Sequence, residues 1–420
     1  MKKILKSFFS MQVMIVLLFF MAVSCALATF VENDFGALGA KSFVYEQTWF
    51  ELIMLILVIG IVFNIVWFKM YKKEKFFIFF IHISFVFILL GATLTRYMGY
   101  EAYMTIPEGS LENKMYSSDE YIQIKNDDEI IYDKKVLMTP LSQTSVDFMT
   151  LINGEELSIK LNRYVKNAVE KIVPTKDGQA LINIIVSQQK GTKSIDLKDQ
   201  DIIESNFLVF ALNKEVKASK PTVIFETKGN EIFIKSNIQT NVYTKDFKKV
   251  KTLKANINTP LILEQIYRIG QTQFMVNEAT TKGALKTVSL NSNMPKDKQL
   301  NAVVLDLKYK GKTQEVSLFG KGGATKGFVK KVKLDNQTIS LSWGSKMIEL
   351  PFSILLNDFR LKRYPGSNSP STYESDIKIY DKHSDDTLEY TIFMNNVLDY
   401  KGYRFFQSSY KQDESATILS

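Results

Sequence analysis

This chain of 420 residues has few of the residues that build redox and metal centres. It has one cysteine, Cys25, in an apolar segment near the N-terminus, and only two histidines. The region after residue 99 has no cysteine, which excludes disulfides, cysteine metal sites and thiol catalysis there. A region of more than 300 residues buries enough apolar surface to fold without such cross-links.

Catalytic motifs are also missing. The sequence has no phosphate-binding glycine loop, no paired-histidine metal motif and no sharp turn around a nucleophilic serine. Its carboxylates are numerous but form no recognisable pair. The net charge is +9, but acidic residues are interleaved with basic ones in the polar part of the chain. We therefore expect neither a catalytic site nor a nucleic-acid partner.

Long apolar runs are confined to the first 95 residues. Three runs, at about 8–31, 49–68 and 76–95, reach the roughly 20 residues needed to cross a bilayer. The sequence therefore predicts an integral membrane protein with a transmembrane anchor over residues 1–98. The remainder, 99–420, reads as a large all-β domain.

The first run has two competing interpretations. Lysines precede it, and Ala26-Leu27-Ala28 resembles a signal-peptide cleavage site. The run is longer than the apolar core of a typical signal peptide, which favours a retained span.

Charge and tryptophan positions predict the orientation. Trp49 and Trp67 lie near the ends of the second run, roughly 27 Å apart along a helix, as expected for side chains at the two membrane interfaces. Four lysines occupy 69–75, against one in 31–48. By the positive-inside rule, the N-terminus and the loop 69–75 are cytoplasmic, and everything after about residue 96 is extracytoplasmic.

Alternating runs separated by turn residues predict β-hairpins in the polar region. Residues 222–235 turn at Lys228-Gly229-Asn230, and residues 303–318 turn at Lys310-Gly311-Lys312. A faint internal repeat relates the second hairpin to residues 180–197, with a possible third copy near His383. Repeated hairpins favour sandwich-like or barrel-like units. Chance similarity between amphipathic strands is the alternative explanation.

One histidine, His82, lies inside the third apolar run, roughly 9 Å from its cytoplasmic end. An ionisable side chain there is costly to bury and marks a candidate functional site. Three roles remain open from the residues alone: a structural hydrogen bond to a neighbouring helix, a proton relay, or an axial ligand to a metal or haem. His383 lies in a polar, turn-like segment on the opposite side of the membrane, so it cannot partner His82.

Three stretches carry a resemblance to a known family. The first runs from His82 through Gly91-Ala92 to residues 95–109. The second is LNDFRLKRYPGS at 356–367, and the third is MNNVLDYKGYRFFQSSY at 394–410. In these stretches the chain resembles the ResB/CcsB family of cytochrome c biogenesis proteins (System II).

The resemblance implies a function. The family works with a CcsA-type, tryptophan-rich membrane protein, carries haem outward across the bacterial inner membrane and presents it for covalent attachment to apocytochrome c. It implies that His82 is an axial ligand of haem, with haem iron the only metal bound. This chain would be non-catalytic alone and would act as a subunit, or one half, of the haem-attachment complex in the lipid bilayer.

The chain departs from the family in two ways. It ends at Ser420 without the further span usual after the soluble domain, and it lacks the tryptophan-rich segment and histidines of the partner. We therefore expect a piece of a longer protein, such as the N-terminal half of a fused CcsB–CcsA protein. The rival interpretations are a membrane-tethered scaffold, adhesion or sensor module without haem, and a subunit of a proton-coupled transporter.

Overall fold

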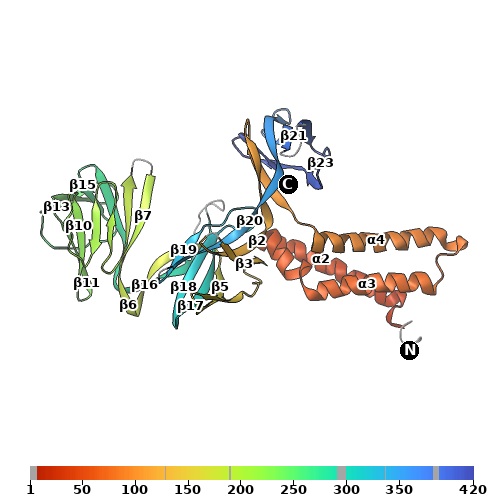
Figure 1. The fold of residues 1–420 in the computed structure, drawn as a ribbon, viewed down its shortest axis with the longest axis horizontal. Helices are drawn as coiled ribbons and strands as arrows, with labels where there is room; N and C mark the ends of the chain where they lie inside the picture. Colours follow the sequence, from red (N-terminus) through yellow and green to blue (C-terminus); the bar gives the residue numbers. More distant parts are fainter. Residues whose placement is uncertain (1–6, 128, 189–190, 291–298, 336, 382–386) are drawn as a thin grey trace. The chain divides into compact units, whose positions relative to one another are not determined.

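The computed structural model describes residues 7–127, 129–188, 191–290, 299–335, 337–381 and 387–420. Three N-terminal helices are followed by strands organised in sheets (Figure 1). The predicted fold class, an apolar helical anchor followed by a large all-β region, is therefore confirmed. His383 and the turn around it lie outside the described residues, as does part of the turn at 189–190.

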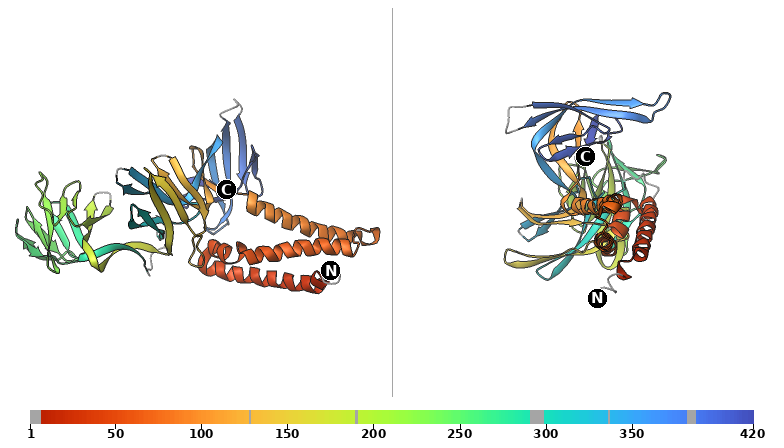
Figure 2. Two further views of the ribbon diagram at one scale, coloured as in Figure 1. Left: turned by 60° about the horizontal axis from the view of Figure 1, so that its bottom comes forward. Right: turned by 90° about the vertical axis from the view of Figure 1, so that its right-hand side faces the viewer.

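Three of the helices are long and apolar enough to cross a membrane. They are α2 (Met11–Ala40), α3 (Thr48–Trp67) and α4 (Phe76–Met98), with a short π-helical turn (Lys41–Tyr45) after α2 and a 3-10 turn (Lys73–Lys75) before α4. The three long helices run side by side (Figure 2). Each expected apolar run thus lies largely within one helix.

The first helix extends well beyond the apolar run that ends near residue 31. It continues to Ala40, with a non-helical backbone at Gly36 (φ 77°), where glycine tolerates a conformation that other residues avoid. Glu32 and Asp34 end the apolar run but are compatible with a helix. The hydropathy pattern therefore marks where apolar character ends and not where the helix ends.

Two glycines of the helices differ in their surroundings: α2 packs closely against Gly60, whereas the described residues leave the space beside Gly91 empty. A Cβ atom added at Gly60 of α3 would meet the Met14 sulfur of α2 at 2.3 Å, so the missing side chain permits this contact. A Cβ atom at Gly91 of α4 would meet no atom within 4 Å. Within the described residues, no neighbouring helix fills the space beside Gly91.

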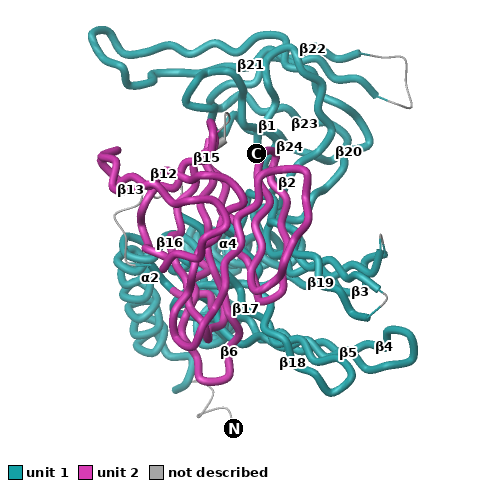
Figure 3. Tube along the Cα trace, turned by 90° about the vertical axis from the view of Figure 1, so that its left-hand side faces the viewer, with its two compact units in different colours: residues 1–168, 289–420 teal, residues 169–288 magenta. Residues whose placement is uncertain are grey.

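The β-rich part and the helices divide into two compact units, residues 1–168 with 289–420 and residues 169–288 (Figure 3). The first unit has a nine-stranded sheet in the order β22-β21-β20-β2-β1-β26-β25, with β19 beside β20 and β3 beside β2. These strands are β1 (Ala102–Pro107), β2 (Leu111–Asn126), β3 (Glu129–Val136), β19 (Lys330–Leu334), β20 (Gln337–Arg363), β21 (Pro370–Asp381), β22 (Thr387–Phe393), β25 (Gln407–Tyr410) and β26 (Ala416–Leu419).

A four-stranded sheet in the order β18-β17-β5-β4 faces part of the large sheet across a shared core. It contains β4 (Asp147–Ile152), β5 (Glu155–Val165), β17 (Asn301–Tyr309) and β18 (Lys312–Gly320). Buried Ile122, Leu305 and Trp343 belong to this core. A second core, with Phe352 and Ile377, lies further along β20 and is joined by the small hairpin β23 (Leu398–Tyr400) and β24 (Tyr403–Phe405).

The second unit is a sandwich of a five-stranded and a six-stranded sheet. The first contains β8 (Ile202–Glu204), β9 (Val209–Leu212), β10 (Thr222–Lys228), β11 (Glu231–Ser236) and β14 (Thr259–Pro260). The second contains β6 (Ala168–Gln188), β7 (Gly191–Lys198), β12 (Thr240–Tyr243), β13 (Lys249–Leu253), β15 (Ile266–Ile269) and β16 (Thr272–Ser289). Both sheets contribute to one apolar core.

The predicted hairpins are present. β10 pairs with β11, β17 pairs with β18, and β6 pairs with β7, all antiparallel. β7 and β18 alternate between buried and more exposed residues in their second halves. β10 and β17 instead have four consecutive buried residues each, so both of their faces are covered.

Candidate functional site

His82 lies in the first half of α4, one turn after Ile78. Its Nδ1 atom is 2.8 Å from the carbonyl oxygen of Ile78. A carbonyl oxygen only accepts hydrogen bonds, so in the neutral ring Nδ1 carries the hydrogen and Nε2 presents its lone pair. A metal-binding histidine uses the same arrangement, in which one ring nitrogen is held by a hydrogen bond and the other binds the metal.

The His82 side chain lines a cavity of about 650 Å³ between the helices. This volume is in the range of sites that hold organic ligands of drug size, roughly 300–1,000 Å³. The walls are formed by α2, α3, the following loop and α4, and most of them are apolar: Met11, Met14, Ile15, Leu18, Met21, Leu57, Ile61, Asn64, Phe68, Met70, Lys75, Ile78, His82, Phe85, Ile88 and Leu89.

The cavity fits a haem group chemically. Haem iron binds imidazole nitrogen, the porphyrin faces suit apolar walls, and His82 and Lys75 are the only titratable side chains among the lining residues. Within the described residues, no group of three or more His, Cys, Asp or Glu side chains could hold a bare metal ion.

At the other end of α4, polar side chains tie the helix to α3. Arg96 forms an ion pair with Glu51 at 2.5 Å, and its guanidinium donates to the backbone carbonyl of Tyr45. The hydroxyl of Tyr97 donates to the same Glu51 carboxylate at 2.9 Å. Glu51 thus fixes the end of α4 against α3.

A second cavity, of about 500 Å³, lies where the chain leaves α4 and enters the sheets. Its walls come from the end of α4, β1, β2, β24 and β26, and include the aromatic residues Tyr100, Tyr403 and Phe405. Burial and a hydrogen bond with Tyr403 raise the pKa of Tyr100 above its ordinary value. The cavity adjoins the segment 394–410 that carries part of the family resemblance.

A buried carboxyl group lies beside the single tryptophan of the β-rich part. Glu120 on β2 is 2% exposed, and its Oε2 accepts a hydrogen bond from the indole Nε1 of Trp343 at 3.0 Å. Backbone amides of Met138 and Gly323 also donate to it. Burial outweighs these donors and raises the pKa of Glu120 to about 7.

The end of the first helical segment docks close to this group. Lys41 pairs with Asp119 at 3.4 Å, and the buried hydroxyls of Ser42 and Thr139 are 3.0 Å apart. Asp119 also pairs with Lys135 at 2.6 Å. The residues around Glu120 therefore join the helical anchor to β2 and β3.

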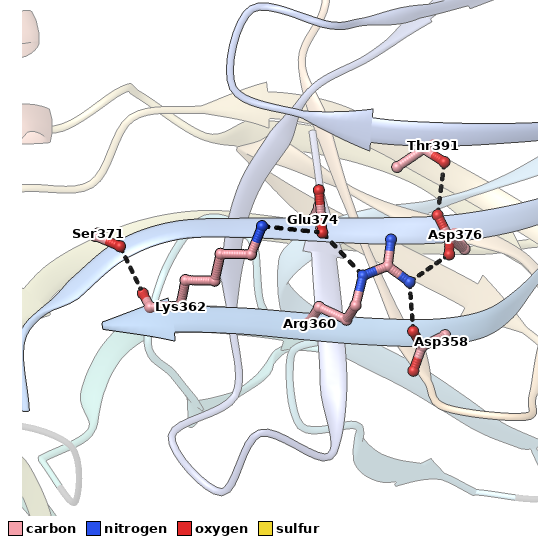
Figure 4. Close-up of polar contacts among 7 residues, drawn as sticks. All are labelled: Asp358, Arg360, Lys362, Ser371, Glu374, Asp376 and Thr391. Atoms are coloured by element: carbon pink, nitrogen blue, oxygen red, sulfur yellow. Dashed lines mark hydrogen bonds and ion pairs between the residues drawn. The ribbon is translucent and has the colours of Figure 1, made fainter. Parts of the chain in front are cut away.

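A half-buried ion-pair cluster lies on β20 and β21, in the stretch that includes the motif at 356–367 (Figure 4). The Arg360 guanidinium contacts the carboxylates of Asp358 and Asp376, each at 2.5 Å, and of Glu374 at 2.8 Å. Thr391 donates a further hydrogen bond to Asp376. These contacts lower the pKa of Asp376 and hold neighbouring strands in register, so we assign the cluster a structural role.

The sequence singled out His82, whose role as a haem ligand stays a prediction, and gave no role to Lys75 or Glu120. In the sequence, Lys75 is only one of the four lysines that predict the orientation in the membrane. No sequence pattern distinguishes Glu120 from the many other carboxylates of the chain. The contact of Glu120 with Trp343 joins residues 223 positions apart, which no local pattern shows. The lysine at 75 directly precedes α4 and lies seven residues before His82, and this proximity in the sequence is a signal that could have been used.

Comparisons with known proteins agree with the family resemblance that the sequence motifs indicated. Residues 328–420 match the ResB-like family, a stretch that contains β20, the Arg360 cluster and the C-terminal strands. The chain is 28% identical over 418 residues, its whole length, to Protein NrfI of Wolinella succinogenes. It spans about a third (32%) of the length of that relative. The resemblance to the ResB-like family indicated by the sequence is therefore confirmed.

Proposed function

We propose that this chain is a component of cytochrome c maturation that binds haem in the cavity between its membrane helices. The resemblance to ResB-like proteins indicates the pathway, and the observation that carries the proposal is His82. Its imidazole lies in an apolar cavity with Nε2 available for a ligand. When bound, haem supplies an iron for axial ligation and vinyl groups that react with cysteine thiols of apocytochrome c.

The residues of this chain would hold and orient the group without acting as catalysts. His82 provides an axial nitrogen, and the apolar side chains of α2 and α4 exclude water from the porphyrin faces. The Ile78 carbonyl fixes the orientation of the imidazole ring. A second axial ligand and the attachment reaction would come from a CcsA-type partner, either separate or fused, with apocytochrome c as the acceptor.

The charge pattern supports a direction for transport. Four lysines lie in 69–75, next to the end of α4 that carries His82. We propose that this end faces the cytoplasm, that the membrane is the bacterial inner membrane, and that the sheets lie in the periplasm. Haem would then enter the cavity from the cytoplasmic side, where it is made, and leave toward the sheets.

The direct test is an absorption spectrum of the protein purified in detergent with its CcsA-type partner co-expressed. We expect His82→Ala to lose bound haem, and we expect added imidazole to restore it. The matched control is His383→Ala, which removes the chain's other histidine. Equal haem in the wild type and His82→Ala, or no haem in either, would contradict the proposal.

A further inference from the structure

Lys75 lines the same cavity as His82. It is the last residue of the 3-10 turn Lys73–Lys75 and directly precedes α4, seven positions before His82. The cavity therefore has the imidazole of His82 in its wall and a cation at the end of α4 that adjoins the basic loop.

The cation at this end of the cavity has no carboxylate partner among the described residues. Its Nζ donates to the backbone carbonyl of Phe68 at 3.0 Å, which uses one of three ammonium hydrogens. No aspartate or glutamate contributes to the cavity walls. The opposite end of α4 differs, since Arg96 there is paired with Glu51 at 2.5 Å.

An apolar cavity with one cation at its end is complementary to a molecule with an apolar body and an acidic edge. A carboxylate placed at the cation would gain a charge-assisted hydrogen bond, which is roughly twice as strong as a neutral one. Haem has this character, because its two propionate groups leave one edge of the ring.

We propose that Lys75 binds a propionate of the haem whose iron is bound by His82, and that it thereby sets the orientation of the ring. This inference rests on the proposed function and deepens it by naming a specificity-determining residue. In that orientation the propionate edge would face the basic loop 69–75, and the vinyl edge would lie on the side away from it. The other source of an acidic group, the phosphate of a lipid that occupies the cavity, is distinguished by the test.

The experiment titrates the full chain in a neutral detergent with two probes, iron protoporphyrin IX and its dimethyl ester, and follows absorption. The ester keeps the ring, the iron and the vinyl groups but has no carboxylates. The variants are Lys75→Gln, Lys75→Arg and His82→Ala. The matched control is Lys72→Gln, which removes a lysine of the same loop that does not line the cavity.

We expect Lys75→Gln to bind haem about tenfold more weakly, the loss expected for one hydrogen bond to a charged group. The same variant should bind the ester as the wild type does. Lys75→Arg should retain most of the affinity for haem, and Lys72→Gln should match the wild type for both probes.

Several results would overturn the inference. One is an equal affinity of the wild type and Lys75→Gln for haem, and another is an equal loss for both probes. Displacement of haem from the wild type, but not from Lys75→Gln, by anionic phospholipid vesicles would assign Lys75 to a lipid headgroup. If His82→Ala binds haem as the wild type does, the proposed function fails first and the inference fails with it.

Discussion

The helices and the sheets of this protein bury their apolar side chains to very different degrees. Along α4, all of which the structure describes, Val86 is the single buried residue. In the sheets, Trp343, Phe352 and Phe225 are fully buried. Stability in the β-rich part therefore comes from the chain's own cores, whereas the apolar side chains of α4 remain largely uncovered by the described residues. Binding of a ligand between the helices is compatible with their sparse packing.

The largest difference in stability should appear when one aromatic side chain is removed from the sheets and one from the helices. Trp343→Ala deletes a fully buried side chain and leaves the Glu120 carboxyl without its indole donor, so the free energy of unfolding should fall by about 3–5 kcal/mol. Phe87→Ala removes a side chain of α4 that is 68% exposed and should change the stability of the sheets little. Denaturant unfolding in detergent measures both. Comparable losses in the two variants would remove the distinction between the regions.

The next effect depends on pH and concerns Glu120. Its pKa is raised from an ordinary 4.5 to about 7 in the folded chain, so folding takes up a proton between these values. The free energy of unfolding should therefore be greatest below pH 4.5 as far as this group is concerned, and should fall as pH rises to about 7. A shift of this size corresponds to at most about 3 kcal/mol. Unfolding measured from pH 5 to 8 tests the slope.

The matching variant is Glu120→Gln, which has no proton to exchange in this range. Its unfolding should depend less on pH than that of the wild type between pH 5 and 7. An unchanged slope would mean that another group is responsible.

A smaller effect is expected at the contact between α2 and α3. Gly60→Val places a branched side chain against Met14, and overpacking of this kind costs about 1–3 kcal/mol. Met14→Ala in the same protein should recover most of the loss. Gly91→Val, where the space is open, serves as the control in thermal unfolding. A similar effect at both glycines would contradict the close approach at Gly60.

The smallest effect should come from the half-buried ion-pair cluster on β20 and β21. Arg360→Ala leaves three carboxylates close together, but the Arg360 side chain is 41% exposed and solvent screens the repulsion. We expect a loss of about 1 kcal/mol or less, decreasing further with added salt. Denaturation at low and high salt gives the comparison, and a loss as large as that of Trp343→Ala would assign the cluster more than a structural role.

The parts of the fold that depend on local pattern could be predicted from the sequence. Apolar runs located the three helices, and turn residues such as Lys310-Gly311 located the hairpins. The separate unit 169–288 could not be predicted, because the chain leaves the first unit along β6 and returns along β16. The cavity around His82 also depends on contacts from α2, such as Met14, that periodicity along α4 does not reveal.

The central claim is that the His82 nitrogen binds haem iron, and the most direct measurement is electron paramagnetic resonance of ferric haem in the chain labelled with nitrogen-15 histidine. Purified without a partner, the wild type and His383→Ala should both show coupling of iron to a labelled nitrogen. His82→Ala reconstituted with unlabelled imidazole should bind haem and show no labelled coupling. Labelled coupling that persists in His82→Ala, or is absent from the haem-loaded wild type, would contradict the claim.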